Sequence, residues 1–96
     1  MIVSFADRTT SDLFHGNASR RVWRLPTQVI EPALDKLDIL NAARALKDLR
    51  SPPGNRLEQL KGDLSGFYSI RINSQWRIIF EWDGGDAYNV KIIDYH

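Results

Sequence analysis

The sequence predicts an α+β domain, with an N-terminal strand and helices packed on one face of a mainly antiparallel sheet. Two observations favour this class. Apolar residues recur at helical spacing through residues 26–49, and apolar residues alternate with polar ones through residues 68–92. Helices that precede a run of hairpin-connected strands are typical of this arrangement. With 96 residues, we expect a single domain that spans residues 1–96.

The N-terminal part predicts a short strand and then a short helix. Residues 1–5 contain strong β-formers and favour a strand. Asp7 is a candidate N-cap for a helix that ends near His15. The segment 16–19, Gly-Asn-Ala-Ser, then interrupts the helical pattern.

The main helical part covers residues 26–49. One apolar stripe at helical spacing consists of Ile30, Leu34, Leu37 and Leu40. Pro26 and Thr27 suit a helix start. Pro32 then predicts either a helix start near Glu31 or a kink there, because proline supplies no backbone N–H. A second apolar stripe is rotated from the first, which predicts a bend near Asn41; it consists of Ile39, Ala43, Leu46 and Leu49. The proline-rich turn of residues 50–55 ends the helical part.

Period-two patterns predict the strands of the sheet. The alternating apolar runs are Tyr68, Ile70 and Ile72, then Trp76, Ile78, Phe80 and Trp82, then Tyr88, Val90 and Ile92. Each run is expected to share one strand face, so both tryptophans are predicted to be core residues. Residues 73–75 and 83–86 supply the turns, and the two glycines of the second turn suit positive φ. A short strand around residues 57–60 is expected to precede these strands.

Alternation also fixes a register for the first hairpin. If Ile72 and Trp76 both face the core, the simplest loop has three residues, and Arg71 then lies directly opposite Arg77. Two opposed cations on a sheet are unfavourable. They are tolerated if they are solvated, if they pair with an acid such as Glu81, or if an anion binds between them. The sequence leaves these three alternatives open.

Composition limits the function classes. The net charge of +1 argues against unaided coating of nucleic acid, although arginines cluster in residues 20–24 and basic residues in 44–61. The chain has no cysteine, and its two histidines are far apart, so we expect no metal site and no cofactor. No apolar run approaches the roughly 18 residues of a membrane span, and the N-terminus lacks the features of a signal peptide. We therefore expect a cytoplasmic protein without membrane contact.

Trp23 lies between Arg21 and Arg24 and is ambiguous. Packing is the favoured interpretation, and stacking on a base or on a partner surface is the alternative. His15 lies near a predicted helix end and is expected to have no chemical role.

Residues 94–96, Asp-Tyr-His, concentrate proton-handling groups at the end of a predicted strand. Histidine titrates near neutral pH, so His96 can protonate a leaving 5′-oxygen or accept a proton from a 2′-hydroxyl. Tyr95 can donate or accept a hydrogen bond there, and Asp94 can orient the imidazole or act as the base. The alternatives are a frayed histidine, a packed tyrosine and a solvated aspartate.

Cationic residues around this segment suit a phosphate. Arg77, helped by Arg71 or Lys61, can stabilise the charge that builds on a phosphate during cleavage. The candidate RNA-binding residues are Arg56, Arg71, Asn73 and Gln75. RNA fits this set better than DNA because its 2′-hydroxyl is a built-in nucleophile that needs no metal. The products would be a 2′,3′-cyclic phosphate and a 5′-hydroxyl.

Strand alternation raises one conflict in this interpretation. Asp94 and His96 share the parity of the predicted core residue Val90. Strict alternation therefore places Tyr95, and not His96, beside Arg77. A bulge in the strand, or an end that runs past the covering helices, would remove the conflict, and both stay open.

Several stretches carry a family resemblance when they are taken together. They are residues 49–58 (Leu-Arg-Ser-Pro-Pro-Gly-Asn-Arg-Leu-Glu), 69–73 with 75–77, 94–96 and, earlier, 36–43. Together they resemble HigB-type toxins of the RelE/ParE superfamily. The resemblance covers residues 30–96 well and the N-terminal third only loosely.

This resemblance implies a RelE-like fold and the toxin of a type II toxin–antitoxin pair. Family members are typically mRNA endoribonucleases that cut message in the ribosomal A site without metal. Carried over residue by residue, the implied active site consists of Lys61, Arg77, Asp94, Tyr95 and His96. Lys61 matches because it follows residues 57–60, Leu-Glu-Gln-Leu, as the family's lysine does. The implied partners are mRNA on the ribosome and a cognate antitoxin with a helix-turn-helix DNA-binding domain.

Two other functions fit the same fold. One is a non-catalytic toxin that acts by target binding, as in the gyrase-inhibiting ParE branch of the superfamily. The other is a plain protein-interaction module whose arginines contact only a partner. The fold alone does not choose among the three, and the Asp-Tyr-His segment favours the nuclease.

Overall fold

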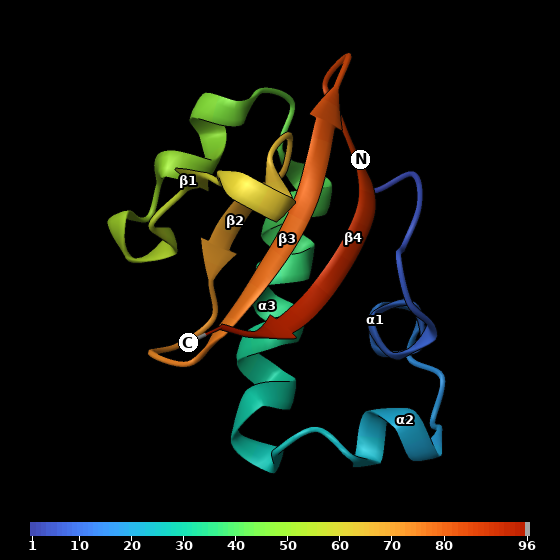
Figure 1. The fold of residues 1–96 in the computed structure, drawn as a ribbon. Coiled ribbons are helices and arrows are strands. Elements are labelled where there is room, and N and C mark those ends of the chain that lie inside the picture. The colour runs from blue at the N-terminus through green and yellow to red at the C-terminus, as the bar shows by residue number, and fades with distance from the viewer. Residues whose placement is uncertain (96) are drawn as a thin grey trace.

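The computed structural model describes residues 1–95 and contains a four-stranded antiparallel sheet (Figure 1). The strands are β1 (Glu58–Gln59), β2 (Tyr68–Arg71), β3 (Trp76–Asp83) and β4 (Asp86–Asp94), in the spatial order β1-β2-β3-β4. This arrangement confirms the predicted α+β class, the run of antiparallel strands and the short strand near residues 57–60. Each strand pairs with the next one along the chain, as hairpin connections require.

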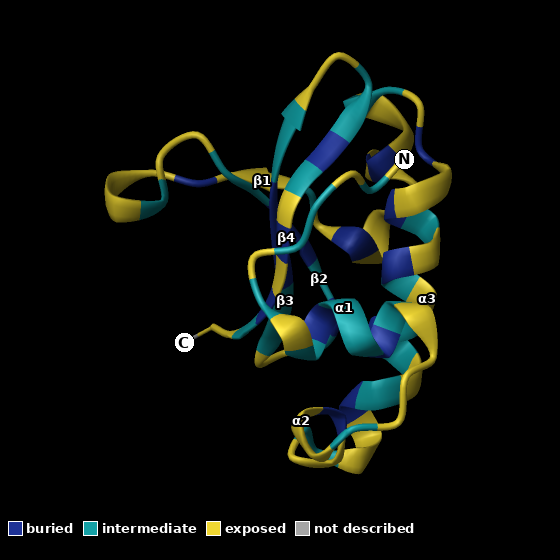
Figure 2. Ribbon diagram, turned by 90° about the vertical axis from the view of Figure 1, so that its right-hand side faces the viewer, coloured by how far each residue is buried: buried dark blue, intermediate teal, exposed yellow. Residues whose placement is uncertain are grey.

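The α-helices are α1 (Arg8–His15), α2 (Arg20–Trp23) and α3 (Thr27–Ala42). The Asp7 carboxylate accepts a hydrogen bond from the Thr10 N–H at 2.9 Å, as predicted for the N-cap of α1. Gly16 ends α1 with a φ of 72°, which a residue without a Cβ adopts readily. Figure 2 shows α1 and α3 on the same side of the sheet, so the α-helices cover one of its faces.

α3 begins at Thr27, so the alternative of a helix start near Glu31 is wrong. Pro32 lies inside the helix, where it supplies no N–H to the hydrogen-bond ladder. The helix ends at Ala42, close to the predicted bend, and the second apolar stripe continues in a 3-10 helix. The connections between α3 and β2 contain η1 (Leu46–Arg50), η2 (Pro53–Asn55) and η3 (Gly62–Leu64).

The N-terminal segment runs beside the outer edge of β4, parallel to it. Two isolated bridges, Ile2 with Ala87 and Phe5 with Val90, join the segment to the strand. The predicted strand over residues 1–5 is thus reduced to two bridges, because a bulge in β4 separates their partners. The segment still covers an edge whose backbone groups would otherwise be unpaired.

The bulge in β4 lies at Asn89, which has a φ of 53°, and the β3–β4 register shifts by one residue there. The extra residue turns Tyr88 away from the face that carries Val90. The prediction that these two residues share a face is therefore wrong, and Ala87 occupies the buried position instead. Asparagine tolerates this left-handed conformation better than most residues do.

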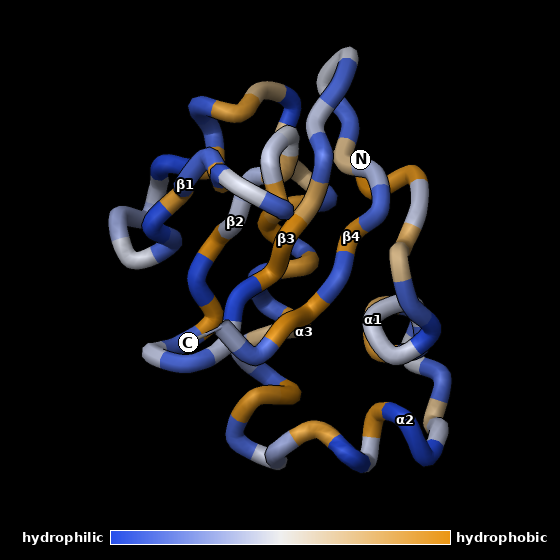
Figure 3. The backbone as a smooth tube through the Cα atoms, in the orientation of Figure 1, coloured by the Kyte–Doolittle hydropathy of each residue, from blue (hydrophilic) through white to orange (hydrophobic). Residues whose placement is uncertain are grey.

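The hydrophobic core lies between the sheet and the α-helices, with Phe80 and Leu37 among its fully buried residues. Figure 3 shows hydrophobic stretches of β3 and β4 that alternate with hydrophilic ones, as expected for a sheet with one covered face. Trp76 and Trp82 pack against this core, as predicted. Trp23 is 72% exposed, so the prediction that it packs is wrong.

Candidate active site

The end of β4 is fastened to the turn between β2 and β3. Asp94 lies opposite Trp76 in the β3–β4 ladder, and the Tyr95 N–H donates to the Gln75 carbonyl at 2.7 Å. The Gln75 side-chain Nε2 also donates to Asp94 Oδ2 at 3.1 Å. These bonds position Asp94 and Tyr95, the first two residues of the Asp-Tyr-His segment. The third member, His96, lies outside the residues that the structure describes.

Arg77 lies on the sheet face opposite the α-helices, since its neighbour Ile78 points into the core. Its guanidinium donates to Ser69 Oγ at 3.1 Å and to Glu58 Oε1 at 3.4 Å. The guanidinium carbon lies 5.0 Å from the centre of the Tyr95 ring, within the range of a cation–π contact. Only 14% of the Arg77 side chain is exposed. The contacts with Ser69, Glu58 and Tyr95 therefore hold a largely buried cation in one place.

Glu58 and Ser69 belong to this cluster, and the sequence interpretation missed both. Ser69 is fully buried, and Glu58 lies opposite it in the β1–β2 ladder with 49% of its side chain exposed. Ser69 could have been predicted from the sequence. It precedes Arg71 by two residues, so period-two alternation places both on one face of the sheet. Glu58 could not have been predicted in this way, because β1 has two exposed residues and no apolar pattern to fix its register.

Arg71 and Arg77 are directly opposite each other in the β2–β3 ladder, which confirms the predicted three-residue loop. Arg77 is paired with an acid, but that acid is Glu58. Glu81, the acid named for that alternative, instead accepts a hydrogen bond from the Asn89 side-chain amide at 2.7 Å, so the alternative of an Arg–Glu81 pair is wrong. Arg71 makes no hydrogen bond or ion pair with the described part of the chain.

Asn73 organises the turn beside this cluster. Its Oδ1 accepts hydrogen bonds from the N–H groups of Gln75 at 2.9 Å and Trp76 at 2.8 Å, an arrangement in which the side chain replaces a backbone acceptor. The structure therefore gives Asn73 a role in folding. Its contact with RNA, like that of Gln75, stays a prediction.

Lys61 and Arg56 flank β1, two residues after it and two residues before it. Both side chains are exposed, and Arg56 has a positive φ of 45°. Within residues 1–95, neither forms a hydrogen bond or an ion pair with the Arg77 cluster. Both residues lie beside the strand that supplies Glu58. Their roles in catalysis and RNA binding stay predictions.

Tyr95 is the residue that lies beside Arg77, as strict alternation along β4 predicts. The bulge at Asn89 precedes Val90, so it does not change the alternation between Val90 and the end of the strand. The phenol is thus the proton-handling group that the sheet itself brings to the guanidinium.

A hollow of about 410 Å³ lies at the hairpin end of β3, lined by residues that include Glu81, Trp82 and Tyr88. None of the predicted site residues that the structure describes lines this hollow. Within residues 1–95, no three side chains of the His, Cys, Asp or Glu types gather as a metal site requires. The candidate active site is therefore the open surface around Arg77.

Comparisons with known proteins connect this fold and these motifs to one family. The family model described as "RelE-like toxin of type II toxin-antitoxin system HigB" matches residues 3–96. This chain belongs to the HigB-like toxin family. The match confirms the resemblance seen in the sequence, and it includes the N-terminal third that resembled the family only loosely.

Two relatives are similar over nearly their whole length. Toxin HigB-1 of Vibrio cholerae serotype O1 is 42% identical over 92 residues, which covers 96% of this chain and 95% of the relative. Endoribonuclease HigB of Proteus vulgaris is 33% identical over 96 residues and covers 100% of both chains. The second name agrees with the predicted class of activity.

Solved toxin structures share the fold. The YoeB–YefM complex from Staphylococcus aureus matches with a TM-score of 0.61 at 16% identity and covers 100% of this chain and 98% of that chain. The YoeB/ParE toxin from Agrobacterium tumefaciens matches with a TM-score of 0.53 at 17% identity, over 100% and 99%. At these identities the likeness shows the fold alone, and it confirms the expected toxin fold.

Family membership makes this chain the toxin of a type II toxin–antitoxin system, whose partner is an antitoxin. Within residues 1–95, no helix has both the length and the apolar character that a membrane crossing requires.

Proposed function

We propose that this toxin is an endoribonuclease that cleaves mRNA on the ribosome without a metal. The observation that carries the proposal is the immobilised guanidinium of Arg77 beside Tyr95. A cation held in place before the substrate arrives stabilises developing phosphate charge without reorganising at the moment of reaction. Arginine has five N–H donors, so the bonds to Ser69 and Glu58 leave donors for phosphate oxygens.

The proposed reaction uses the 2′-hydroxyl of RNA as the nucleophile. A base takes the 2′-proton, the 2′-oxygen forms a bond to phosphorus, and the bond from phosphorus to the 5′-oxygen breaks. An acid then gives a proton to the leaving 5′-oxygen. The products are a 2′,3′-cyclic phosphate and a 5′-hydroxyl, and the reaction needs no metal because the substrate supplies its own aligned nucleophile.

Four groups are candidates for the two proton transfers. Asp94, Tyr95 and His96 are the groups that the sequence suggests, and Glu58 joins them because its Oε1 lies 3.4 Å from an Arg77 nitrogen. A carboxylate that touches the phosphate-binding cation lies close to any 2′-hydroxyl adjacent to that phosphate. We assign Glu58 as a candidate base alongside Asp94.

The RNA-binding residues are proposed to surround this centre. Arg71 is the best placed of them, because it lies opposite Arg77 and has no counter-ion within residues 1–95. It suits the phosphate next to the one that is cleaved. The exposed cations Arg56 and Lys61 extend the same face along β1.

The low net charge of this chain supports the proposal that cleavage depends on the ribosome. Tight binding of RNA requires several cations matched to phosphates, and this chain has a net charge of only +1. A toxin with so little surplus charge is suited to a message that rRNA already holds. The same proposal includes a cytoplasmic location and an antitoxin with a helix-turn-helix DNA-binding domain.

The test is to express the toxin and to map 5′-hydroxyl ends on cellular mRNA. We expect new ends within message, and cleavage in a purified system that requires ribosomes and is unchanged when the toxin is first dialysed against a chelator. Arg77→Ala should abolish these ends, whereas Arg50→Ala, at an exposed arginine of η1, should not. Intact message together with a DNA-damage response would contradict the proposal and favour a toxin that acts by target binding.

A further inference from the structure

Three arginines and a tryptophan on α2 and its C-cap form a surface that the proposed reaction does not use. We define the α2 surface as Arg20, Arg21, Trp23 and Arg24, all of which are exposed. Trp23 is 72% exposed, more than any other large hydrophobic side chain that the structure describes. Figure 1 shows α2 at a different corner of the molecule from the end of β4, so this surface is separate from the candidate active site.

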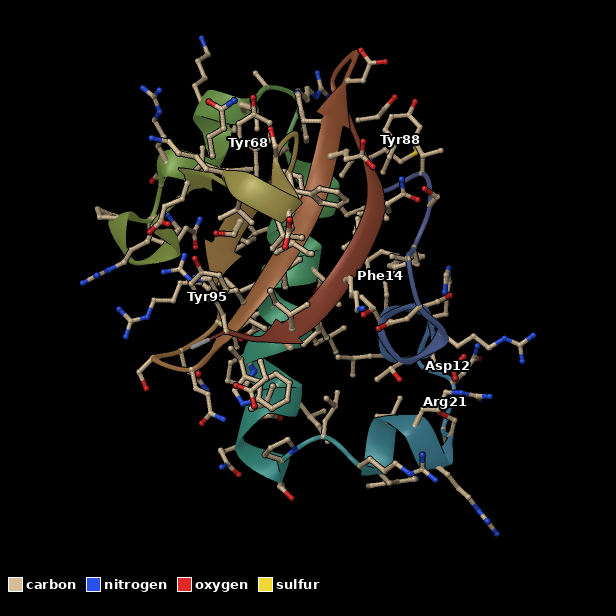
Figure 4. The ribbon with its side chains drawn as sticks, in the orientation of Figure 1. Asp12, Phe14, Arg21, Tyr68, Tyr88 and Tyr95 are labelled. Atoms are coloured by element: carbon tan, nitrogen blue, oxygen red, sulfur yellow. The ribbon has the colours of Figure 1, made fainter. Side chains whose placement is uncertain are left out.

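An apolar groove adjoins the α2 surface. It has a volume of about 200 Å³ and lies where α1, α2 and α3 meet. The apolar residues that line it are Leu13, Ala18, Val22 and Leu34. Small-molecule pockets have about 300–1,000 Å³, so this groove suits a single apolar side chain better. Asp12 is the one acid in its lining, and Figure 4 shows Asp12 and Arg21 at the same corner.

The chemistry of this corner favours a protein partner over RNA. Tryptophan and arginine are the side chains that most often dominate the energy of protein–protein interfaces. A groove lined by leucine and valine offers nothing to a sugar–phosphate backbone but suits an apolar anchor from a polypeptide. The three guanidinium groups select a partner that carries Asp or Glu beside that anchor.

We infer that the antitoxin docks on the α2 surface through an acidic segment that places one apolar side chain in the groove. Family membership supplies the protein partner, and the exposed tryptophan, the arginines and the groove supply its place and its chemistry. The inference depends on the toxin–antitoxin pairing and not on RNA cleavage, because none of these residues belongs to the proposed active site.

The experiment measures by calorimetric titration how the toxin binds the antitoxin, taken as the protein encoded beside it. Trp23→Ala and Arg21→Glu should each weaken the affinity about thirtyfold or more, as central interface residues do. Ala18→Phe, which fills the groove from its rim, should also weaken it. Lys47→Glu, at an exposed lysine on η1, is the charge-matched control and should bind normally. Thermal melting checks that each variant is folded.

Two outcomes would overturn the inference. The first is unchanged antitoxin affinity in both Trp23→Ala and Arg21→Glu. The second is loss of ribosome binding with normal antitoxin affinity, which would make the α2 surface an RNA-binding surface. Cleavage by the free variants is measured in parallel and should equal that of the wild type. If the wild type does not cleave RNA, the proposed function fails while the binding result still stands.

Discussion

The guanidinium carbon of Arg77 lies 5.0 Å from the centre of the Tyr95 ring. This contact joins β3, one of the two inner strands of the sheet, to the residue that follows β4. The Tyr95 N–H is bound to the Gln75 carbonyl at 2.7 Å, so the ring, the turn and the cation form one unit. The fold, and not the substrate, therefore positions the cation, which is the condition for strong electrostatic stabilisation of a transition state.

Arg77→Lys is expected to lower kcat/KM for cleavage of ribosome-bound message by roughly 10²–10³-fold, the usual cost of losing a preorganised donor. Lysine keeps the charge but lacks the planar fork that bonds Ser69 and Glu58 together. Cleavage rates measured with Arg50→Lys as control test this. A near-wild-type rate for Arg77→Lys would show that charge alone suffices.

Tyr95→Phe is expected to retain more cleavage activity than Tyr95→Ala. Phenylalanine keeps a ring over the Arg77 guanidinium, and such a contact at a partly exposed site contributes about 0.5–1 kcal/mol. Alanine removes the ring and frees the guanidinium to move. Single-turnover cleavage of both variants measures the difference. Equal losses would mean that the hydroxyl matters and that the positioning role of the ring is wrong.

Glu58→Gln is expected to lower the cleavage rate at least about tenfold, because a general base contributes about 10²–10⁴-fold when it acts alone. The free energy of unfolding should change by less than about 1 kcal/mol, since the ion pair with Arg77 is partly exposed. Cleavage assays and urea unfolding separate the two effects. Glu31→Gln, at an exposed glutamate of α3, serves as control. A normal rate for Glu58→Gln would remove this residue from the list of candidate bases.

Parts of the fold and of the site could be predicted because apolar periodicity reports which side chains are buried. If Ile72 and Trp76 both face the core, the simplest register of β2 against β3 has a three-residue loop. That register places Arg71 opposite Arg77, as the structure shows. The same alternation predicted Tyr95 beside Arg77. The family motifs, and not the periodicity, identified the toxin class.

Other parts could not be predicted, for identifiable physical reasons. Glu58 reaches Arg77 through a two-residue strand, which is too short for any pattern to fix its register. The bulge at Asn89 interrupts alternation without a sequence signal beyond asparagine's tolerance of positive φ. Trp23 belongs to a four-residue helix, where periodicity cannot show which side is buried.

Asp48 predicts a pH-dependent contribution to stability. Its carboxylate accepts the N–H groups of Arg44 at 3.0 Å and Ala45 at 3.1 Å, and these bonds lower the pKa of Asp48 below 3.8. Because the folded-state pKa is the lower one, the contribution is present above 3.8 and is lost as the pH falls through the folded-state value. The stability difference between the wild type and Asp48→Asn should therefore shrink on acidification. Urea unfolding at neutral pH and at several values below 3.8 measures it, and a difference that grows would contradict the assigned hydrogen bonds.

Thr10→Val is expected to destabilise the fold by roughly 1–3 kcal/mol, the cost of leaving a buried polar group without a partner. Thr10 is fully buried, and its hydroxyl oxygen accepts the Ile92 N–H at 3.0 Å, joining α1 to the outer edge of β4. Valine has a similar shape but no acceptor, so the Ile92 N–H loses its partner while the packing is kept. Thr10→Ser should be closer to the wild type because it retains the hydroxyl. Thr9→Val, at the neighbouring half-buried position, is the matched control for the same exchange, and its stability should be almost unchanged. Urea unfolding measures all three. If Thr10→Val were as stable as Thr9→Val, the hydrogen bond would not be what fastens α1 to the strand that carries the candidate active site.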